Sequence, residues 1–518
     1  MAEERLEEIR KLRLEKRQKL IDAGQPPYPA EVRRTHTIKE ILKNFDELEQ
    51  DTTPLMVLGR VMSIRAHGGV VFLDVRDASG ELQLQIARND VEGDAFERLD
   101  LLDAGDWIQA AGMAGKTKRG VNTLMVTTWH VVSKAVRPIP NEWYGLKDHE
   151  TRYREREVDL LLNEDVKKVF VMRSRIIHWL REYLTIEGFL EVETPTLQII
   201  PGGAMAKPFE THHNALDMTL YMRIAPELYL KRLIVAGYEK VFDIGKNFRN
   251  EGVDRQHNPE FTMLEFYQAY ADYEDLMDMT EKMLSRLVKD IFSKSEISWQ
   301  GLNLSFEAPF KRVRYVDLVS EELGVDILED KNPETYLKMF DEKGLEYPDV
   351  QSYAQLVDEL YKELIRPTLQ QPTLLYDYPT EMFPLAKRNL HDQRIAETFQ
   401  LLVTGLELVK AYTELNDPVE QRKRFEEQME RRDEGDPEAQ RIDEDYLRAM
   451  EYGMPPVAGW GMGIDRLVML LTDAPSIRDT ILFPLLRPET TTPPSPAKAG
   501  STSPSRQYGG QAPGEEKL

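Results

Sequence analysis

Residues 248–267 carry the decisive pattern of this chain: Phe248-Arg-Asn-Glu-Gly-Val-Asp-Arg-Gln-His-Asn-Pro-Glu-Phe-Thr-Met-Leu-Glu-Phe-Tyr267. The pattern predicts an apolar strand, a charged loop and a second strand. Because side chains alternate along a strand, we expect Arg249 and Glu251 on one face of the first strand. One face of the second strand would carry Phe261, Glu265 and Tyr267. Unpaired charges are too costly for an apolar core, so the hairpin predicts a ligand with both negative and positive groups.

The composition of the whole chain excludes several classes of site. A length of 518 residues allows roughly two to four domains. A net charge of −23 argues against indiscriminate nucleic-acid binding, although local basic patches can still contact RNA. The chain has no cysteine, which removes disulfides, thiol catalysis and thiolate metal sites. No apolar run approaches the length of a membrane span, so we expect a cytoplasmic protein with no membrane partner.

The first part of the chain predicts a helix followed by a barrel. Leucine and isoleucine recur at helical spacing across residues 2–23, between Glu, Arg and Lys. This amphipathic helix is either a solvated cap or a basic face that touches RNA. Short alternating segments then predict five strands, at residues 56–62, 70–75, 81–86, 107–112 and 124–127. Short strands joined by glycine-containing turns are typical of a small closed barrel.

Changes in composition predict the domain boundaries. We expect a helical lead-in over residues 1–50, the barrel over 51–140, and a linker over 141–157 that follows two prolines. A larger α+β domain, with helical elements inserted near 310–375, is expected over 158–488. Residues 489–518 consist mainly of Thr, Pro, Ser, Gly and Ala with almost no apolar bulk, so we expect a disordered tail.

Two further motifs gain meaning from the hairpin. The stretch Gly459-Trp-Gly-Met-Gly-Ile-Asp-Arg466 precedes an apolar helix, and its glycines let backbone approach a ligand closely. A tight strand–helix turn would also explain those glycines. The stretch Gly188-Phe-Leu-Glu-Val-Glu-Thr-Pro195 follows an amphipathic helix over 171–184 and, taken alone, is an ordinary helix–turn–strand unit.

In this order and spacing, the three motifs resemble the signature motifs of class II aminoacyl-tRNA synthetases. The preceding barrel narrows the resemblance to the aspartyl, asparaginyl and lysyl subgroup. The lysyl-like stretches are residues 200–209, 212–216, 223–232 and 412–418. The resemblance implies an α+β multidomain fold: an N-terminal OB-fold β-barrel that binds the tRNA anticodon, then an antiparallel-sheet catalytic domain flanked by helices. It also implies a homodimer.

The resemblance implies a lysine–tRNA ligase with ATP and L-lysine as substrates, tRNA(Lys) as acceptor and Mg²⁺ as cofactor, the number of ions being open. Neither step of that reaction needs a protein nucleophile, which agrees with a chain lacking cysteine. The implied catalytic residues are Arg249, Glu251 and Arg466. The implied ATP-binding residues are Arg249, Glu251, His257, Phe261, Glu407 and Arg466.

Charge also favours lysine as the substrate. Carboxylates and a phenol at the end of the pocket would attract the two ammonium groups of lysine and repel aspartate by several kcal/mol. The resemblance places lysine among Gly203, Glu227, Arg249, Glu265, Tyr267, Lys410, Tyr412 and Glu414. In the barrel it places anticodon reading on Arg65, Phe72 and Gln83, because an aromatic ring stacks on an unpaired base while an arginine and an amide read its edges.

Two positions depart from the lysyl pattern. The family usually has a glutamate that helps to hold magnesium where this chain has Gln400, and an asparagine where it has Lys410. The expected metal ligands are therefore Glu407 and, doubtfully, Gln400. Either the Lys410 ammonium replaces part of the magnesium's role, or Lys410 pairs with a nearby acid. Strand parity puts Glu407 on the opposite face from Lys410, so a bulge or turn must separate them if both are used.

Three other functions remain open at this stage. A paralogue that lysylates another acceptor, such as elongation factor P, is disfavoured because such paralogues resemble the catalytic domain alone. A non-catalytic RNA-binding protein is disfavoured by the charged residues of the motifs. An aspartyl- or asparaginyl-type enzyme is disfavoured by the acidic pocket.

Overall fold

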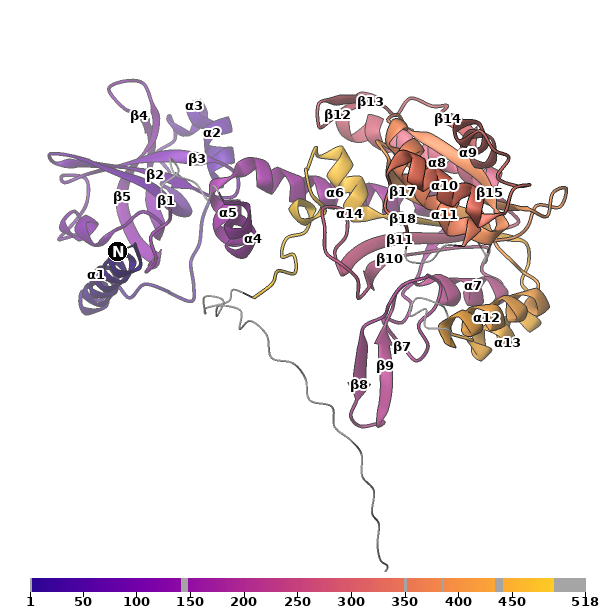
Figure 1. The fold of residues 1–518 in the computed structure, drawn as a ribbon. Helices are drawn as coiled ribbons and strands as arrows, with labels where there is room; N and C mark the ends of the chain where they lie inside the picture. The colour runs from indigo at the N-terminus through magenta and orange to yellow at the C-terminus, as the bar shows by residue number, and fades with distance from the viewer. Residues whose placement is uncertain (1, 141–147, 349–351, 384–385, 434–440, 489–518) are drawn as a thin grey trace, which may run out of the picture. The chain divides into compact units, whose positions relative to one another are not determined.

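The computed structural model describes residues 2–140, 148–348, 352–383, 386–433 and 441–488 (Figure 1). The chain divides into two compact units, Met1–Leu162 and Asn163–Leu518. Residues 141–147 of the expected linker and the whole expected tail, 489–518, lie outside the described residues. Within the part that is described, no helix has both the length and the apolar character needed to cross a membrane.

The first unit is built around a closed five-stranded barrel with the strand order β1-β2-β3-β5-β4. Its strands are β1 (Leu55–His67), β2 (Val70–Arg76), β3 (Glu81–Ala87), β4 (Trp107–Lys116) and β5 (Asn122–Ser133). Its helices are α1 (Ala2–Asp22), α2 (Ile38–Lys43), α3 (Phe45–Leu48), η1 (Glu97–Leu101), α4 (His149–Arg154) and α5 (Arg156–Leu162). Alternate residues of β2, such as Val71 and Leu73, are buried inside the barrel. The expected N-terminal barrel is confirmed.

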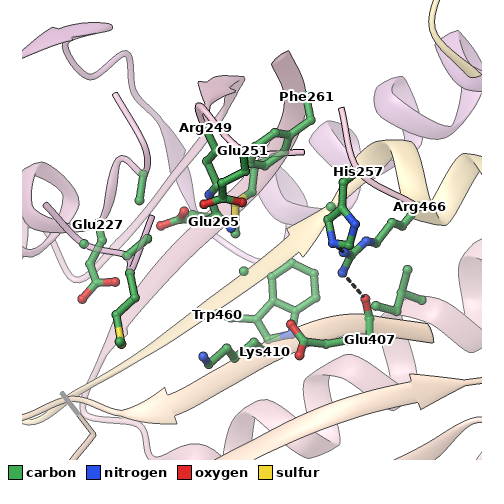
Figure 2. Close-up of a pocket in the computed structure, with 18 of the residues that line it drawn as sticks. Glu227, Arg249, Glu251, His257, Phe261, Glu265, Glu407, Lys410, Trp460 and Arg466 are labelled. Atoms are coloured by element: carbon green, nitrogen blue, oxygen red, sulfur yellow. Dashed lines mark hydrogen bonds between the residues drawn. The ribbon is translucent and has the colours of Figure 1, made fainter. Parts of the chain in front are cut away.

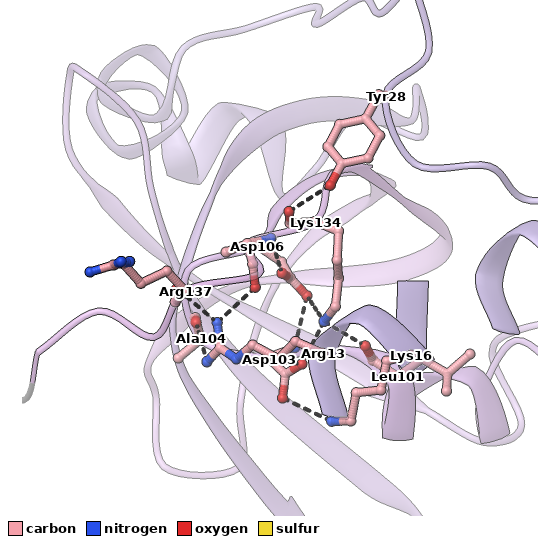
Figure 3. A network of polar contacts seen from close by, with 10 residues as sticks. Arg13, Lys16, Tyr28, Leu101, Asp103, Ala104, Asp106, Lys134 and Arg137 are labelled. Carbon is pink, nitrogen blue, oxygen red and sulfur yellow. Dashed lines mark hydrogen bonds and ion pairs between the residues drawn. The ribbon is translucent and has the colours of Figure 1, made fainter. Parts of the chain in front are cut away.

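Polar contacts join α1 to the barrel (Figure 3). Arg13 is buried and donates to the carbonyl oxygens of Ala104 at 3.1 Å and Ala135 at 2.9 Å. Lys16 lies 2.8 Å from Asp103. The fully buried ammonium of Lys134 contacts Asp103 as well and lies 2.7 Å from Asp106. Two basic residues of α1, Arg13 and Lys16, are therefore engaged in contacts with the barrel.

The second unit contains an eight-stranded sheet with the order β14-β15-β16-β17-β18-β11-β10-β6. Its strands are β6 (Leu190–Glu191), β10 (Lys240–Phe248), β11 (Glu260–Ala269), β14 (Lys311–Arg314), β15 (Thr373–Pro379), β16 (Ile395–Val403), β17 (Leu406–Thr413) and β18 (Val457–Gly463). The pairs β10–β6 and β14–β15 at the two edges are parallel, and all other pairs are antiparallel. The expected antiparallel catalytic sheet is confirmed.

Three helices pack together with one face of this sheet: α6 (Glu164–Ile186), α8 (Tyr273–Phe292) and α14 (Ile464–Leu471). Asp272 caps α8, because its side chain accepts from the backbone N–H groups of Glu274 and Asp275. Leucine and methionine along α8 then join Leu264 and Phe266 of β11 in one core. Since side chains alternate along a strand, the odd-numbered residues of β11 face the other way.

Other helices cover the opposite face of the sheet. The helices α7 (Glu227–Val235) and α13 (Glu444–Glu451) share a core with Tyr267, and α12 (Pro418–Asp433) packs on α13. Inserted between β14 and β15 are α9 (Tyr315–Leu323), α10 (Pro333–Lys343), α11 (Tyr353–Leu360), η2 (Tyr361–Ile365) and η3 (Arg366–Thr368). The remaining elements are β7 (Leu197–Gln198), β8 (Glu210–His213), β9 (Met218–Met222), β12 (Glu296–Trp299), β13 (Leu302–Ser305), η4 (Thr380–Met382) and η5 (Ile477–Thr480).

Candidate active site

A cavity of about 310 Å³ lies on the face of the sheet opposite α6 and α8 (Figure 2). The odd-numbered residues of β11 line it: Phe261, Met263, Glu265 and Tyr267. Neighbouring strands complete the lining with Glu407, Lys410 and Tyr412 of β17 and with Gly459, Gly461 and Gly463 of β18. The structure thus brings together most of the residues that the sequence singles out.

Glycines of β18 make room for the cavity. In the sheet register, Gly459 lies between Tyr412 of β17 and Tyr267 of β11. A Cβ atom at Gly459 would overlap Oε1 of Glu414 and approach Tyr267 to 2.5 Å. At Gly461 it would lie 2.8 Å from Cε of Met263. Glycine is required here because these neighbours approach the backbone closely.

The loop after β10 holds the first two predicted residues, and here the expected strand is wrong. β10 ends at Phe248, so Arg249 and Glu251 lie in the loop rather than on one strand face. Arg249 N still donates to the carbonyl oxygen of Pro259 at 2.9 Å, but Asn250 N turns away to the carbonyl oxygen of Lys207 at 2.7 Å. Both predicted side chains nevertheless line the cavity.

The Arg249 guanidinium is positioned for a ligand. It lies 5.1 Å from the centre of the Phe261 ring. Its Nε atom is buried and has no hydrogen-bond partner within the described part of the chain. A buried donor without a partner is costly, so this atom favours an anionic ligand at the Arg249 side of the cavity.

At one end of the cavity, Arg466 joins three elements. Its Nη1 donates to the carbonyl oxygen of Glu407 at 2.9 Å, and its Nη2 lies 3.0 Å from Nε2 of His257. His257 Nδ1 is 2.8 Å from Asp254. Burial lowers the pKa of Arg466, with Glu407 opposing that shift. An exposed His257 and a cationic Arg466 together suit negatively charged groups of a ligand.

Asp465 fixes the start of α14 and was not predicted as a site residue. Its carboxylate accepts from the backbone N–H of Thr262 at 2.6 Å and from Arg173 at 2.6 Å. These two contacts tie the arginine-bearing helix to β11 and α6. The sequence signal was its position directly before Arg466, but nothing in the pattern shows the distant partners.

The other end of the cavity is acidic and contains a second residue that was missed, Lys231. This lysine is 2% exposed, and its ammonium lies 2.6 Å from Oε1 of Glu227 and in contact with Glu414. Tyr412 donates to Oε2 of Glu227 at 3.0 Å. A spacing of four residues at the start of a helix could have revealed the Glu227–Lys231 pair.

This end of the cavity therefore holds three carboxylates, of which Glu227 and Glu414 contact the buried Lys231. Burial raises the pKa of Glu265 well above its usual range, and the charge of Glu227 adds to the shift while Arg249 opposes it. Burial likewise raises the pKa of Glu414 to about 8, with Lys231 opposing. Glu265 and Glu227 line the cavity, whereas Glu414 is 1% exposed and lies outside the lining. This end of the site is short of positive charge.

The strands β16 and β17 meet with the bulge that the parity argument required. Leu401 pairs with Val409, but Leu402 pairs with Glu407, so Leu408 is the extra residue. The bulge turns Glu407 towards the same cavity as Lys410. Lys410 is exposed, and its ammonium lies 4.6 Å from the centre of the Phe383 ring.

Gln400 lies beside Glu407 and orients towards it as a donor. Its Nε2 donates to Oε2 of Glu407 at 2.8 Å, and its Oε1 accepts from the hydroxyl of Tyr378 at 2.9 Å. Magnesium prefers carboxylate and other oxygen ligands. Among the described residues, no group of three or more His, Asp or Glu side chains is arranged to hold a metal ion. The residues at these positions fit a protein-held magnesium ion poorly.

The barrel residues predicted to read an anticodon lie on adjacent strands. Arg65 pairs with Phe72 in the β1–β2 register, and Asp74 pairs with Gln83 in the β2–β3 register. The guanidinium of Arg65 lies 2.9 Å from Oδ1 of Asp74. Gln83 accepts from Thr123 at 3.1 Å. Phe72 is half-buried and points out of the barrel, because its neighbours in β2 point inward.

Comparisons with known proteins identify similar sequences for both units. Residues 148–487 match the family described as tRNA synthetases class II (D, K and N), and residues 56–132 match the OB-fold nucleic acid binding domain. A protein of Carboxydothermus hydrogenoformans named lysine–tRNA ligase is 46% identical over 488 residues, covering 94% of this chain and 100% of that protein. A protein of the same name from Pelotomaculum thermopropionicum is 47% identical, covering 94% of this chain and 96% of its own length. Another, from Staphylococcus epidermidis, is 44% identical, covering 94% of this chain and 100% of its own.

Proposed function

Because this chain belongs to the class II tRNA synthetases of the aspartyl, lysyl and asparaginyl group, we propose that it is a lysine–tRNA ligase. Within that group, the carboxylates of its cavity are the observation that favours lysine as the substrate. Glu227, Glu265 and Glu414 lie at this end, and Lys231 contacts two of them, Glu227 and Glu414, so this end of the cavity attracts a ligand with ammonium groups. Lysine brings two ammonium groups and one carboxylate.

The reaction proceeds in two steps. A carboxylate oxygen of lysine attacks the α-phosphorus of ATP, the bond from that phosphorus to the bridging oxygen breaks, and pyrophosphate leaves with the electron pair. A hydroxyl of the 3′-terminal ribose of tRNA(Lys) then attacks the carbonyl carbon of lysyl-adenylate. AMP leaves and the hydroxyl proton is released. The protein contributes position and charge, not a nucleophile.

The ATP end of the cavity contains Arg249, Glu251, His257, Phe261, Glu407 and Arg466. Arg249 holds the α-phosphate and the lysine carboxylate, a role supported by its buried Nε without a partner in the described residues. Glu251 and His257 serve the ATP, with His257 towards the outer phosphates. Phe261 and Arg466 hold the adenine between them. Arg249, Glu251 and Arg466 are thus the proposed catalytic residues.

The lysine end contains Gly203, Glu227, Glu265, Tyr267 and Tyr412 in the lining, with Glu414 behind. Glu227 accepts the α-ammonium near the backbone of Gly203. Glu265 and Tyr267 accept the ε-ammonium, and Glu414 adds negative charge from its place over Gly459. Lys231 holds Glu227 and Glu414 in place.

Magnesium enters this scheme as part of the substrate, bound to the phosphates of ATP. Of Gln400, Glu407 and Lys410, only Glu407 has a carboxylate. Gln400 supplies an N–H donor without charge, and Lys410 supplies a cation.

The acceptor is bound through the barrel, with Arg65, Phe72 and Gln83 reading the anticodon, and the enzyme acts as a cytoplasmic homodimer. Exposed apolar residues next to the edge strand β6 support a covered face there: Ile186, Leu190, Leu197 and Ile199. The match to an OB-fold nucleic acid binding domain supports tRNA rather than a protein such as elongation factor P as the acceptor.

The test of this function is ATP–pyrophosphate exchange with each amino acid, followed by charging of total tRNA. Lysine should support exchange, whereas aspartate and asparagine should not. Glu265→Gln should lower kcat/KM for lysine by about a hundredfold or more, because the ligand's ammonium then faces a neutral group. ATP affinity should change by less than about twofold, because the adenine end is separate.

Glu260→Gln is the matched control, since Glu260 lies on the same strand but outside the cavity lining. Normal lysine exchange in Glu265→Gln would rule out the assignment of this carboxylate.

A further inference from the structure

We propose that Lys410 is a fixed cation of the reaction centre, and that it lets this enzyme activate lysine with little need for a magnesium ion held by the protein. The inference rests on the proposed function and concerns how the same site neutralises charge. It is carried by the place of Lys410 along β17 and by the Gln400–Glu407 contact.

Lys410 lies between the two ends of the cavity. Along β17, Glu407 is at the end that contains Arg466, and Tyr412 is at the end that contains Glu227. Lys410 lies between them and is exposed to the cavity. In Figure 2, Lys410 and Glu407 lie on one side of the cavity, and Arg249 and Glu265 on the other. The junction of the two proposed subsites is where the lysine carboxylate must meet the α-phosphate.

The sheet register keeps this junction open. Lys410 pairs with Gly461 of β18, which pairs with Glu265 of β11, so the three residues form one row across three strands. The middle member has no side chain. Ligand atoms can therefore lie between the Lys410 ammonium and the Glu265 carboxylate once the flexible end of the Met263 side chain, which covers Gly461, moves aside. A ligand with a carboxylate and an ammonium group matches this order of charges.

Two negative groups must approach each other in the first step. Arg249 offers a cation from one side of the cavity, and Lys410 offers a second from the other. Fixed cations aimed at developing charge stabilise a transition state without reorganisation during the reaction. The contact with the Phe383 ring holds the Lys410 ammonium in place without neutralising its charge.

The neighbouring residues disfavour a divalent ion at the same place. The Tyr378 hydroxyl donates to Oε1 of Gln400, so the amide N–H of Gln400 points towards Glu407 and donates to it. Glu407 consequently has one oxygen engaged by a donor, and the cations Arg466 and Lys410 lie on either side of it in the lining. An ammonium and an amide together replace the charge that a metal and a second carboxylate would bring.

The experiment compares the wild type with Lys410→Asn, Gln400→Glu and the double variant. Lysyl-adenylate formation is measured in single turnovers with radiolabelled ATP over a range of free magnesium that keeps the ATP as its magnesium complex throughout, from the lowest such level (limiting) to a large excess (saturating). The wild-type rate should change by less than about fivefold. Lys410→Asn should lose about a hundredfold at limiting magnesium and recover in part at saturation, and the double variant should show the steepest dependence.

A second readout is the affinity of a non-hydrolysable ATP analogue, measured by calorimetry with lysine present. Lowering free magnesium from a large excess to the level that just keeps the analogue as its magnesium complex should weaken binding to the wild type by less than about threefold and to the double variant by about tenfold or more. Lys410→Arg keeps the cation and should follow the wild type. Lys338→Asn, an exposed lysine of α10, controls for the loss of any positive charge.

Equal magnesium dependence in the wild type and the double variant would overturn the proposal, as would an analogue affinity for Lys410→Asn that stays unchanged as free magnesium is lowered over that range. Failure of the wild type to activate lysine at any magnesium concentration would instead overturn the proposed function.

Discussion

At the scale of single residues, carboxyl groups of the lysine pocket stay protonated to a higher pH than usual. Burial raises the pKa values of Glu265 and Glu414, the latter to about 8, and the charge of Glu227 adds to both shifts. A diammonium ligand needs these groups ionised. Binding of lysine must therefore release protons whenever the pH is below the raised values.

This linkage predicts the pH dependence of lysine binding. As the pH rises from about 6 towards 8, lysine affinity should increase by up to about tenfold per unit for each carboxyl that must ionise. Calorimetry in buffers of different ionisation enthalpy measures the released protons directly. Glu265→Gln should release fewer of them. Proton uptake on binding would contradict the charge assignment.

The same raised pKa also determines in which direction the stability of the fold changes with pH. A carboxyl whose pKa is raised from 4.5 to about 8 in the folded state stabilises the fold fully below 4.5 and loses that contribution as the pH rises through 8. The free enzyme should therefore lose thermal stability between these values, and lysine should restore it. A melting series at several pH values, with and without lysine, measures both effects.

At the scale of elements, β17 and β18 determine what the site can hold. The bulge at Leu408 turns Glu407 towards the cavity that Lys410 faces. The glycines of β18 then leave room above the backbone between β17 and β11. Both effects come from backbone geometry and not from the chemistry of a side chain.

The glycine strand gives a direct prediction. Gly459→Ala should lower kcat/KM for lysine by about a hundredfold, because its Cβ would overlap Glu414 and displace Tyr267. Gly463→Ala on the same strand is the matched control, since its Cβ would meet Arg466 Cδ at an ordinary 3.7 Å. Exchange assays at varied lysine measure the difference. Equal kinetics in the two variants would show that Gly459 is not needed for space.

Element-scale patterns were also the most predictable part of the molecule. Alternation of apolar residues was enough for the barrel strands, and parity was enough to require a bulge or turn between Glu407 and Lys410 if both residues were used. The end of β10 was not predictable, because Asn250 leaves the strand to bond with the distant Lys207 backbone. Lys231 was missed because a glutamate–lysine pair one helical turn apart usually lies on the surface. The direction of the Gln400 amide depends on Tyr378, twenty-two positions away in the chain.

At the scale of the whole molecule, the two units divide the proposed work. Every residue that lines the cavity belongs to the second unit, and the predicted anticodon residues all belong to the first. Amino-acid activation should therefore be separable from tRNA binding. The three predicted anticodon residues have their contacts within the barrel, so they are positioned before any RNA arrives.

This division predicts the effect of Phe72→Ala. The affinity for tRNA(Lys) should fall about tenfold or more through the loss of base stacking, while lysine-dependent pyrophosphate exchange stays unchanged. Leu58→Ala, another outward-facing and half-buried residue of the barrel, is the control. Filter binding and exchange assays on the same preparations measure both activities. A parallel loss of exchange would argue against separate roles.

The glycines of β18 also bear on how inhibitors of this enzyme would fare. A mutation can add a side chain to a glycine of this surface, but it cannot remove backbone atoms. Any side chain that displaced a compound from above Gly459 would overlap Glu414 and Tyr267, and would exclude lysine as well. Compounds that rest on this strand would leave few single substitutions through which resistance could arise without loss of the substrate.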